Sequence, residues 1–84
     1  MAVTAAEMRA KIATGVNDLS QAEMTIRQAA DQVQQTITLW MGVTDNLQMA
    51  NAVAVLRSAV EELEKFYSQK AHAVAQAEAY AVRI

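Results

Sequence analysis

The spacing of its apolar residues constrains this chain more than any other feature. In the first half, apolar residues recur every seven positions, and further ones lie four positions after some of them. Seven residues make close to two turns of an α-helix, so this spacing places the side chains on one helical face. The pattern predicts a long amphipathic helix whose apolar seam consists of Ala5, Ile12, Val16, Leu19, Ile26, Ala30, Val33, Ile37 and Trp40.

The second half of the chain repeats this spacing. Its seam consists of Met49, Val53, Leu56, Val60, Leu63, Tyr67, Val74 and Ala81, and it is widened on one side by Ala52, Ala59, Phe66, Ala73 and Tyr80. The chain contains no proline, the residue that most reliably ends a helix. A second long helix is therefore predicted.

Capping signals mark the start of each helix. Thr4 is followed three residues later by Glu7, which fits a capping box and predicts a helix that begins at residue 5. Asp45 is followed three residues later by Gln48, which predicts an N-cap at Asp45 and a second helix that begins near Asn46.

The segment between the two helices is too short for anything but a tight reversal of the chain. We therefore predict an all-α fold and a single domain over residues 1–84. It is an antiparallel two-helix hairpin with helices at about 5–38 and 46–82 and a turn at 39–45. Gly42 is predicted to take a positive φ at the end of the first helix, where other residues meet a steric cost.

A hairpin of 84 residues without cysteine has little core of its own. Each apolar stripe is also wider than a contact between two helices requires. We therefore predict that two hairpins, either two copies of this chain or this chain and a paralogous hairpin, pair into a four-helix bundle. The predicted interface consists of Ile12, Val16, Leu19, Ile26, Val33, Ile37, Met49, Val53, Leu56, Val60, Leu63, Phe66, Tyr67 and Val74.

Gly15 lies inside the first predicted helix, where glycine costs about 1 kcal/mol relative to alanine. Met8, Ala22 and Ala29 share its spacing of seven and make a strip of mostly small residues beside the seam. A glycine in such a strip predicts a close approach by a neighbouring helix.

The composition argues against several classes of function. The net charge is −2, and the seven Lys and Arg residues are scattered, so no basic stripe for nucleic acid is present. No apolar run approaches the 18 or more residues of a membrane span. Glu7 interrupts the stretch where a signal peptide needs an apolar core, so no cleavable signal peptide is predicted. An amphipathic hairpin that acts on membranes ranks last, because the polar faces are not rich in Lys and Arg.

The sequence predicts no enzyme, no cofactor and no metal site. His72 is the only histidine, and the residue three positions before it is Gln69, so the Glu-x-x-His pairs of dinuclear bundle sites are missing. Glu61 and Lys65 are predicted to form an ordinary exposed ion pair on a helix. No set of nucleophile, base and electrophile is recognisable.

Two features leave alternatives open. Trp40 either packs the end of the bundle core or presents its indole to a pocket of another protein, where aromatic anchors dominate binding. The outward positions of the first helix are short of charge, which indicates either a second, polar contact face or simple neutral solvation. Those positions are Thr25, Gln28, Gln32, Gln35 and Thr36.

Trp40, Met41 and Gly42 form a Trp-x-Gly turn at the centre of the chain. With this turn, two long helices rich in alanine and glutamine, and no cysteine, the chain resembles the WXG family of small type VII secretion substrates, the early secreted antigen type. The resemblance covers nearly the whole chain. It implies a dimeric bundle secreted without a cleavable signal peptide, by the membrane ATPase of a secretion machine in Gram-positive or actinobacterial cells, and a function in recognition through the turn motif.

The chain departs from this family at its export signal. At least one member of a secreted pair carries Tyr-x-x-x-Asp/Glu after the second helix, but here Ala71 follows Tyr67 and Ile84 follows Tyr80 at that spacing. Either a partner carries the signal or the chain is not exported by this route. The alternative is a small helical structural component of a virion or other multi-subunit particle, packed on a larger scaffold, and then located in the virion or the cytoplasm.

Overall fold

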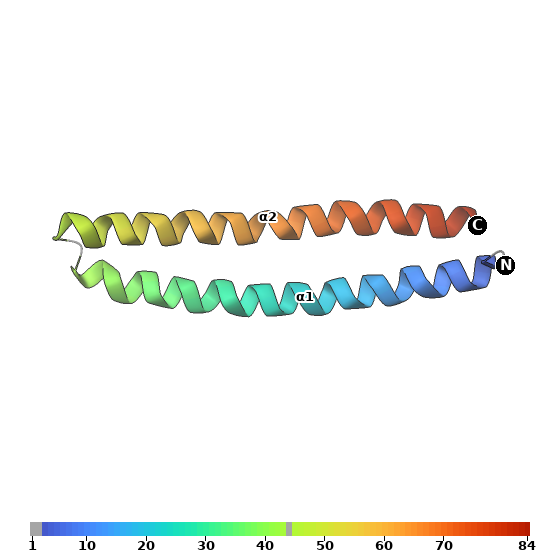
Figure 1. Cartoon of the computed structure of the whole chain (residues 1–84), viewed down its shortest axis with the longest axis horizontal. Helices are drawn as coiled ribbons and strands as arrows, with labels where there is room; N and C mark the ends of the chain where they lie inside the picture. The colour runs from blue at the N-terminus through green and yellow to red at the C-terminus, as the bar shows by residue number, and fades with distance from the viewer. Residues whose placement is uncertain (1–2, 44) are drawn as a thin grey trace.

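The computed structural model describes residues 3–43 and 45–84 and shows an all-α antiparallel hairpin (Figure 1). Helix α1 spans Ala5–Trp40, a single 3-10 turn η1 spans Met41–Val43, and helix α2 spans Leu47–Arg83. The two helices lie side by side along a rod of 63 × 20 × 16 Å, with both chain ends at one end and the turn at the other. The predicted fold class is confirmed.

The helices begin where side chains satisfy the first backbone N–H groups. The Thr4 hydroxyl accepts a hydrogen bond from the Glu7 N–H at 3.1 Å, as the capping box predicts. The predicted N-cap at Asp45 is wrong by one residue, because Asn46 has the extended backbone of a cap and its side chain accepts from Gln48 and Met49. Helix α2 therefore starts one residue later than expected and ends one residue later, at Arg83.

None of the described residues in the turn has a positive φ, so the predicted positive φ of Gly42 is wrong. Helix α1 continues two residues beyond the predicted end at 38, and its last turn tightens into η1, where the Met41 N–H bonds to the carbonyls of Ile37 and Leu39. A 3-10 exit of this kind keeps ordinary helical dihedral angles. The predicted turn at 39–45 also includes Thr44, which lies outside the described residues.

The contact between α1 and α2 is a narrow line of side chains. Only Ile37 and Val53 are buried among the described residues, with 2% and 5% of their surfaces exposed. The other residues of the two seams are half-buried, so one helix covers only part of each seam. The widening stripe of α2 is covered less, since Ala59, Ala73 and Tyr80 are exposed.

Polar contacts also join the two helices at the middle of the rod. Glu23 of α1 pairs with Arg27 at 3.4 Å and reaches Lys70 of α2 at 3.7 Å. The guanidinium of Arg27 lies 4.1 Å from the centre of the Tyr67 ring, the geometry of a cation–π contact. These contacts join the helices beside the half-buried seam.

The open end of the hairpin is joined by two further contacts. The Tyr80 hydroxyl donates to the sulfur of Met8 at 3.6 Å, and the Arg9 Nε donates to the Ala81 carbonyl at 3.4 Å. Both contacts bring the start of α1 against the end of α2, so the two helices stay side by side to the chain ends.

Candidate functional site: the faces that the hairpin leaves open

The hairpin exposes far more surface than a compact chain of its mass. Its accessible surface is 6318 Å², whereas a compact folded protein of 9.1 kDa exposes about 4,900 Å². The radius of gyration is 19.2 Å, against about 12 Å for a compact domain of this length. Roughly 1,400 Å² of surface that a protein of this size normally buries is therefore open.

Part of this open surface forms one continuous side of the hairpin, which we call the small-residue face. The contact of Met8 with Tyr80 shows that the strip of α1 and the widening stripe of α2 lie on the same side at the open end. Because both strips keep a spacing of seven, they stay on that side along the rod. The small-residue face consists of Met8, Gly15, Ala22 and Ala29 of α1 and Ala52, Ala59, Phe66, Ala73 and Tyr80 of α2.

Gly15 lies on this face with open space above it. A Cβ built at Gly15 meets no atom within 4 Å, so the predicted close approach of a neighbouring helix is wrong for α2 of the same hairpin. Within the described residues, packing gives no reason for a glycine here. Any helix that approaches Gly15 closely must come from another chain.

The opposite side of the hairpin is polar. A hollow of about 300 Å³ there is lined by Asp31 and Gln34 of α1 and Glu64 of α2, over a floor of Ala30 and Val60. Two carboxylates of like charge flank this hollow, and neither makes an ion pair with a described residue. This side is therefore suited to water rather than to an apolar partner.

The turn end of the rod is largely apolar. Leu39, Met41, Val43 and Leu47 are all exposed there, with 75% of Leu39 and 77% of Leu47 open to solvent. Trp40 is half-buried, and its indole N–H makes no hydrogen bond to any described residue. The indole therefore packs in part against the seam and keeps its polar edge available, which is compatible with both interpretations of Trp40.

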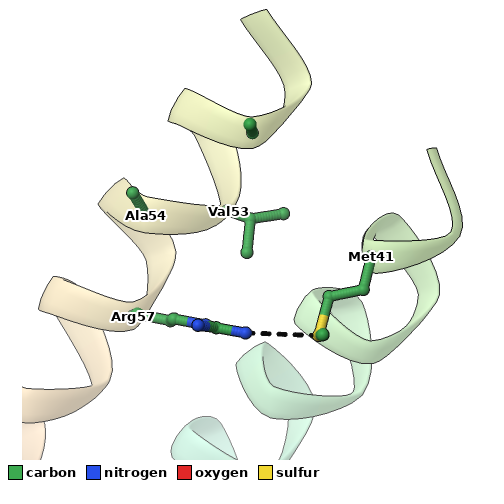
Figure 2. A pocket seen from close by; sticks show the side chains of 5 residues that line it. Met41, Val53, Ala54 and Arg57 are labelled. Carbon is green, nitrogen blue, oxygen red and sulfur yellow. Dashed lines mark hydrogen bonds between the residues drawn. The ribbon is translucent and has the colours of Figure 1, made fainter. Parts of the chain in front are cut away.

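A second hollow lies beside the turn and is shown in Figure 2. It measures about 270 Å³ and is lined by Met41 of η1 and by Ala50, Val53, Ala54 and Arg57 of α2. Arg57 reaches across it and donates from Nη2 to the sulfur of Met41 at 3.3 Å. Met41, which the sequence predicts to be part of the turn motif, therefore contacts Arg57, a residue that the sequence did not indicate.

Gly42 is exposed at the same end, and a Cβ built there meets no atom within 4 Å. Its backbone takes no positive φ either. Neither conformation nor packing within the described residues therefore requires glycine at this position. Trp40, Met41 and Gly42 are close together, but only Met41 lines the hollow beside the turn.

The outer side of α1, which faces away from α2, carries mostly uncharged side chains between residues 21 and 39. Glu23 and Arg27 contact residues of α2, whereas Asp31 is exposed at the edge of the polar hollow, one helical turn from Gln28 and from Gln35. We call this outer surface the amide face, and it consists of Gln21, Thr25, Gln28, Gln32, Gln35 and Leu39, all exposed. Thr36, predicted with this group, is instead half-buried toward the small-residue face.

The outer side of α2 is charged in the ordinary way. Lys65 pairs with Glu62 at 2.7 Å rather than with Glu61, so the predicted partner is wrong by one residue. The hydrogen bond from this exposed Lys65 to the Glu62 carboxylate, with the negative charges nearby, raises the pKa of Lys65. His72 is exposed, and the described residues contain no group of three His, Cys, Asp or Glu side chains that could hold a metal ion.

Neither α1 nor α2, over the residues described, has an apolar stretch long enough to cross a membrane. No protein-family model, no curated protein and no solved structure matches the chain. A function for this hairpin must therefore be argued from the surfaces that it leaves open.

Proposed function

We propose that this chain is a non-enzymatic protein that acts by binding other proteins, and that its small-residue face pairs with a second helical hairpin. The second hairpin is another copy of the chain or a paralogue. The observation that carries this proposal is the surplus of exposed surface along a hairpin in which Ile37 and Val53 are the only buried side chains of the described residues. Pairing of two such faces forms a four-helix bundle, in which the half-buried seam residues become the core.

The size of the surplus fits a permanent partner better than a transient one. If each of two hairpins buries roughly 1,400 Å², the interface totals about 2,800 Å². Interfaces of 2,000 Å² or more are typical of obligate dimers, whereas transient contacts bury about half as much. The small residues let the helices approach closely, and a Cβ built at Gly15 meets no atom within 4 Å.

We further propose that the chain is a WXG-like type VII secretion substrate or the dimer partner of one. Trp40, Met41 and Gly42 lie at the exposed apolar turn, and Gly42 has no structural reason to be glycine within the described hairpin. A glycine at an exposed turn lets another protein approach the backbone closely. That protein is the secretion ATPase in this proposal, the Tyr-x-x-x-Asp/Glu signal is carried by the dimer partner, and the secreted pair acts outside the cell.

The first experiment is light scattering on a sizing column over a hundredfold range of concentration. A constant mass of twice the chain supports a homodimeric bundle. A monomer with low helicity indicates that the partner is a paralogous hairpin, and a fully helical, stable monomer contradicts pairing altogether. Open-ended assemblies favour the alternative, a structural component of a virion or other particle, for which the scarcity of charge on the outer side of α1 is the supporting observation.

Matched variants locate the pairing surface. Ala59→Glu with Ala73→Glu places two charges on the small-residue face at exposed positions, so it should lower the dimer mass to that of the monomer. The control is Ser58→Glu with Gln76→Glu, which adds the same charges on the outer side of α2 and should leave the dimer intact. Equal effects of both pairs would show that the small-residue face is not the interface.

The role of the turn is tested separately from the fold. Trp40→Ala and Gly42→Gln should reduce export, or binding to the secretion ATPase, in a type VII-competent cell that also expresses the partner. The control variant is Leu47→Ala, which removes an exposed apolar side chain from the same end. Loss of helicity and of thermal stability in Trp40→Ala would instead support a packing role for Trp40.

A further inference from the structure

We infer that the hollow beside the turn is a docking site for an acidic segment of another protein, and that Arg57 binds the carboxylate of that segment. The segment is a helix that carries an Asp or Glu side chain and an aliphatic side chain one turn away. The site is separate from the small-residue face. The inference requires neither the pairing of hairpins nor type VII secretion.

The hollow beside the turn lies on the same side of the hairpin as the polar hollow. Met41 follows Gln34 by seven residues, and Glu64 likewise follows Arg57 by seven. Residues seven apart share a helical side, so the two hollows follow each other along one side of the rod. A partner bound beside the turn therefore leaves the small-residue face free for pairing.

Arg57 is held across the hollow by a weak contact. Its guanidinium extends past Val53, and Nη2 donates to the sulfur of Met41 at 3.3 Å (Figure 2). A thioether is a weak acceptor, whereas a guanidinium has five N–H donors. Arg57 forms no ion pair with any described residue, although Glu61 lies at the i+4 spacing at which such pairs form. Most of the donors of Arg57 are thus open to another acceptor.

Arg27 shows what differs at Arg57. Arg27 also reaches the opposite helix, but it pairs with the Glu23 carboxylate at 3.4 Å and lies over the Tyr67 ring. An arginine that only joins the two helices is therefore given a carboxylate by the hairpin itself. At Arg57 the corresponding carboxylate must come from outside the hairpin.

The charge around the hollow favours one carboxylate over a multiply charged anion. Arg57 is the only Lys or Arg between residues 28 and 64. Glu64 follows about 10 Å further along α2, and with Asp31 it lines the polar hollow. These carboxylates repel a phosphate or nucleic acid, which also needs several cations. A single carboxylate needs one guanidinium, which it binds through two parallel hydrogen bonds.

The rest of the hollow is apolar. Ala50, Val53 and Ala54 line it, and its volume of about 270 Å³ equals that of about nine water molecules. A carboxylate bound to Arg57 leaves most of this volume to an aliphatic side chain. Ala54 precedes Arg57 by three residues, or about 5 Å along α2. Side chains one turn apart on a partner helix have the same separation, so they reach both parts of the hollow together.

An NMR titration of the isotope-labelled full chain with a synthetic peptide tests this inference. The probe is an alanine-based helical peptide of about 15 residues, with one Leu and, four residues later, one Glu. Its binding should shift the signals of Ala50, Ala54 and the Arg57 Nε–H in a saturable way. The same peptide with Gln in place of Glu should bind about tenfold more weakly.

Variants of the chain identify the contact. Arg57→Gln should lower the affinity for the Glu peptide about tenfold and leave the affinity for the Gln peptide unchanged, because both changes remove the same contact. The matched control is Arg83→Gln, which removes the same charge at an exposed position of the far end of α2 and should bind like the unmodified chain. Ala54→Leu fills the hollow and should weaken the binding of both peptides.

Three results would overturn the inference. They are no binding of the Glu peptide up to about 5 mM, equal affinities for the two peptides, and equal losses in Arg57→Gln and Arg83→Gln. Light scattering of Arg57→Gln measures the pairing of hairpins separately, and its mass should equal that of the unmodified chain. Failure of the docking site and failure of the pairing are therefore distinguishable.

Discussion

The two helices of this hairpin are alike where they face each other and different where they face away. Helices α1 and α2 have 36 and 37 residues, and each contributes one buried and many half-buried apolar side chains to the contact. The outer side of α2 carries charges such as the Glu62–Lys65 pair, whereas the outer side of α1 carries amides. The residues that hold the two helices together and the residues that remain exposed to solvent therefore lie on separate faces, and only the exposed ones differ in kind between α1 and α2.

A charge introduced at the buried contact between the helices should lower the unfolding free energy most. The loss should be similar whether the charge is placed in α1 or in α2. Ile37→Asp and Val53→Asp each place a carboxylate at a buried site without a partner, which should cost more than about 3 kcal/mol of unfolding free energy. Urea unfolding followed by circular dichroism measures the loss. Val55→Asp, at an exposed site of α2, is the control, and a similar cost there would show that the contact line is not the core of the hairpin.

Loss of either N-cap should have the second largest effect on the stability of the hairpin, and the effect should be similar for α1 and α2. Thr4→Ala and Asn46→Ala each leave backbone N–H groups without an acceptor, which should cost about 1 kcal/mol. Thermal unfolding of both variants, each compared with the unmodified chain, provides the measurement. Asp45→Ala should cost less than half as much stability. A larger loss of stability in Asp45→Ala than in Asn46→Ala would show that Asp45, rather than Asn46, caps α2.

Gly15→Ala should separate the stability of α1 from its contacts with other chains. Alanine removes the helix penalty of glycine and meets no atom within the hairpin, so helicity should rise and unfolding free energy should increase by about 0.5–1 kcal/mol in the isolated hairpin. The added methyl group should at the same time weaken pairing through the small-residue face. Light scattering and circular dichroism at low and high concentration measure both effects, and a gain in pairing would contradict a close approach at Gly15.

The smallest effect is expected at the exposed ion pair on the outer side of α2. The raised pKa of Lys65 means that the contact contributes at a pH below the usual lysine value of about 10.4 and is lost as the pH rises through the raised value. Stability should therefore show no step from this pair between about pH 6 and pH 9. Glu62→Gln should lower the pKa of Lys65, measured by NMR titration, and an unchanged value would assign the shift to Glu61.

Several features of the fold follow from short-range patterns and were therefore predictable. The heptad spacing places Ile37 and Val53 on the helix contact, and the Thr4 hydroxyl caps α1 as its distance from Glu7 in the sequence requires. The predictions at Asp45 and Gly42 failed for one reason. Both depend on the path of the backbone between the helices, which several neighbouring residues determine jointly. Here a 3-10 turn provides hydrogen bonds to the last carbonyl groups of α1 without a positive φ.

The candidate contact faces were predictable only in part. The stripes of α1 and α2 are visible as spacings, but a spacing does not say whether two stripes lie on the same side of a hairpin. Arg57 reaches Met41 although sixteen positions separate them, and no sequence pattern marks that contact. Similarly, the sequence does not say which charged side chains of α1 contact the other helix, and the structure shows that Glu23 and Arg27 do.

By itself, the sequence determined that this chain forms two long helices and that they fold back on each other, because heptad spacing and capping act over a few neighbouring residues. The tertiary structure alone decided which surfaces remain open. How much of each seam the second helix covers depends on the register and rotation of two helices 36 and 37 residues long, and these are set by contacts between distant positions such as Met8 and Tyr80. Two helices can cover only one side of each other, so the rest of each seam stays open to a partner.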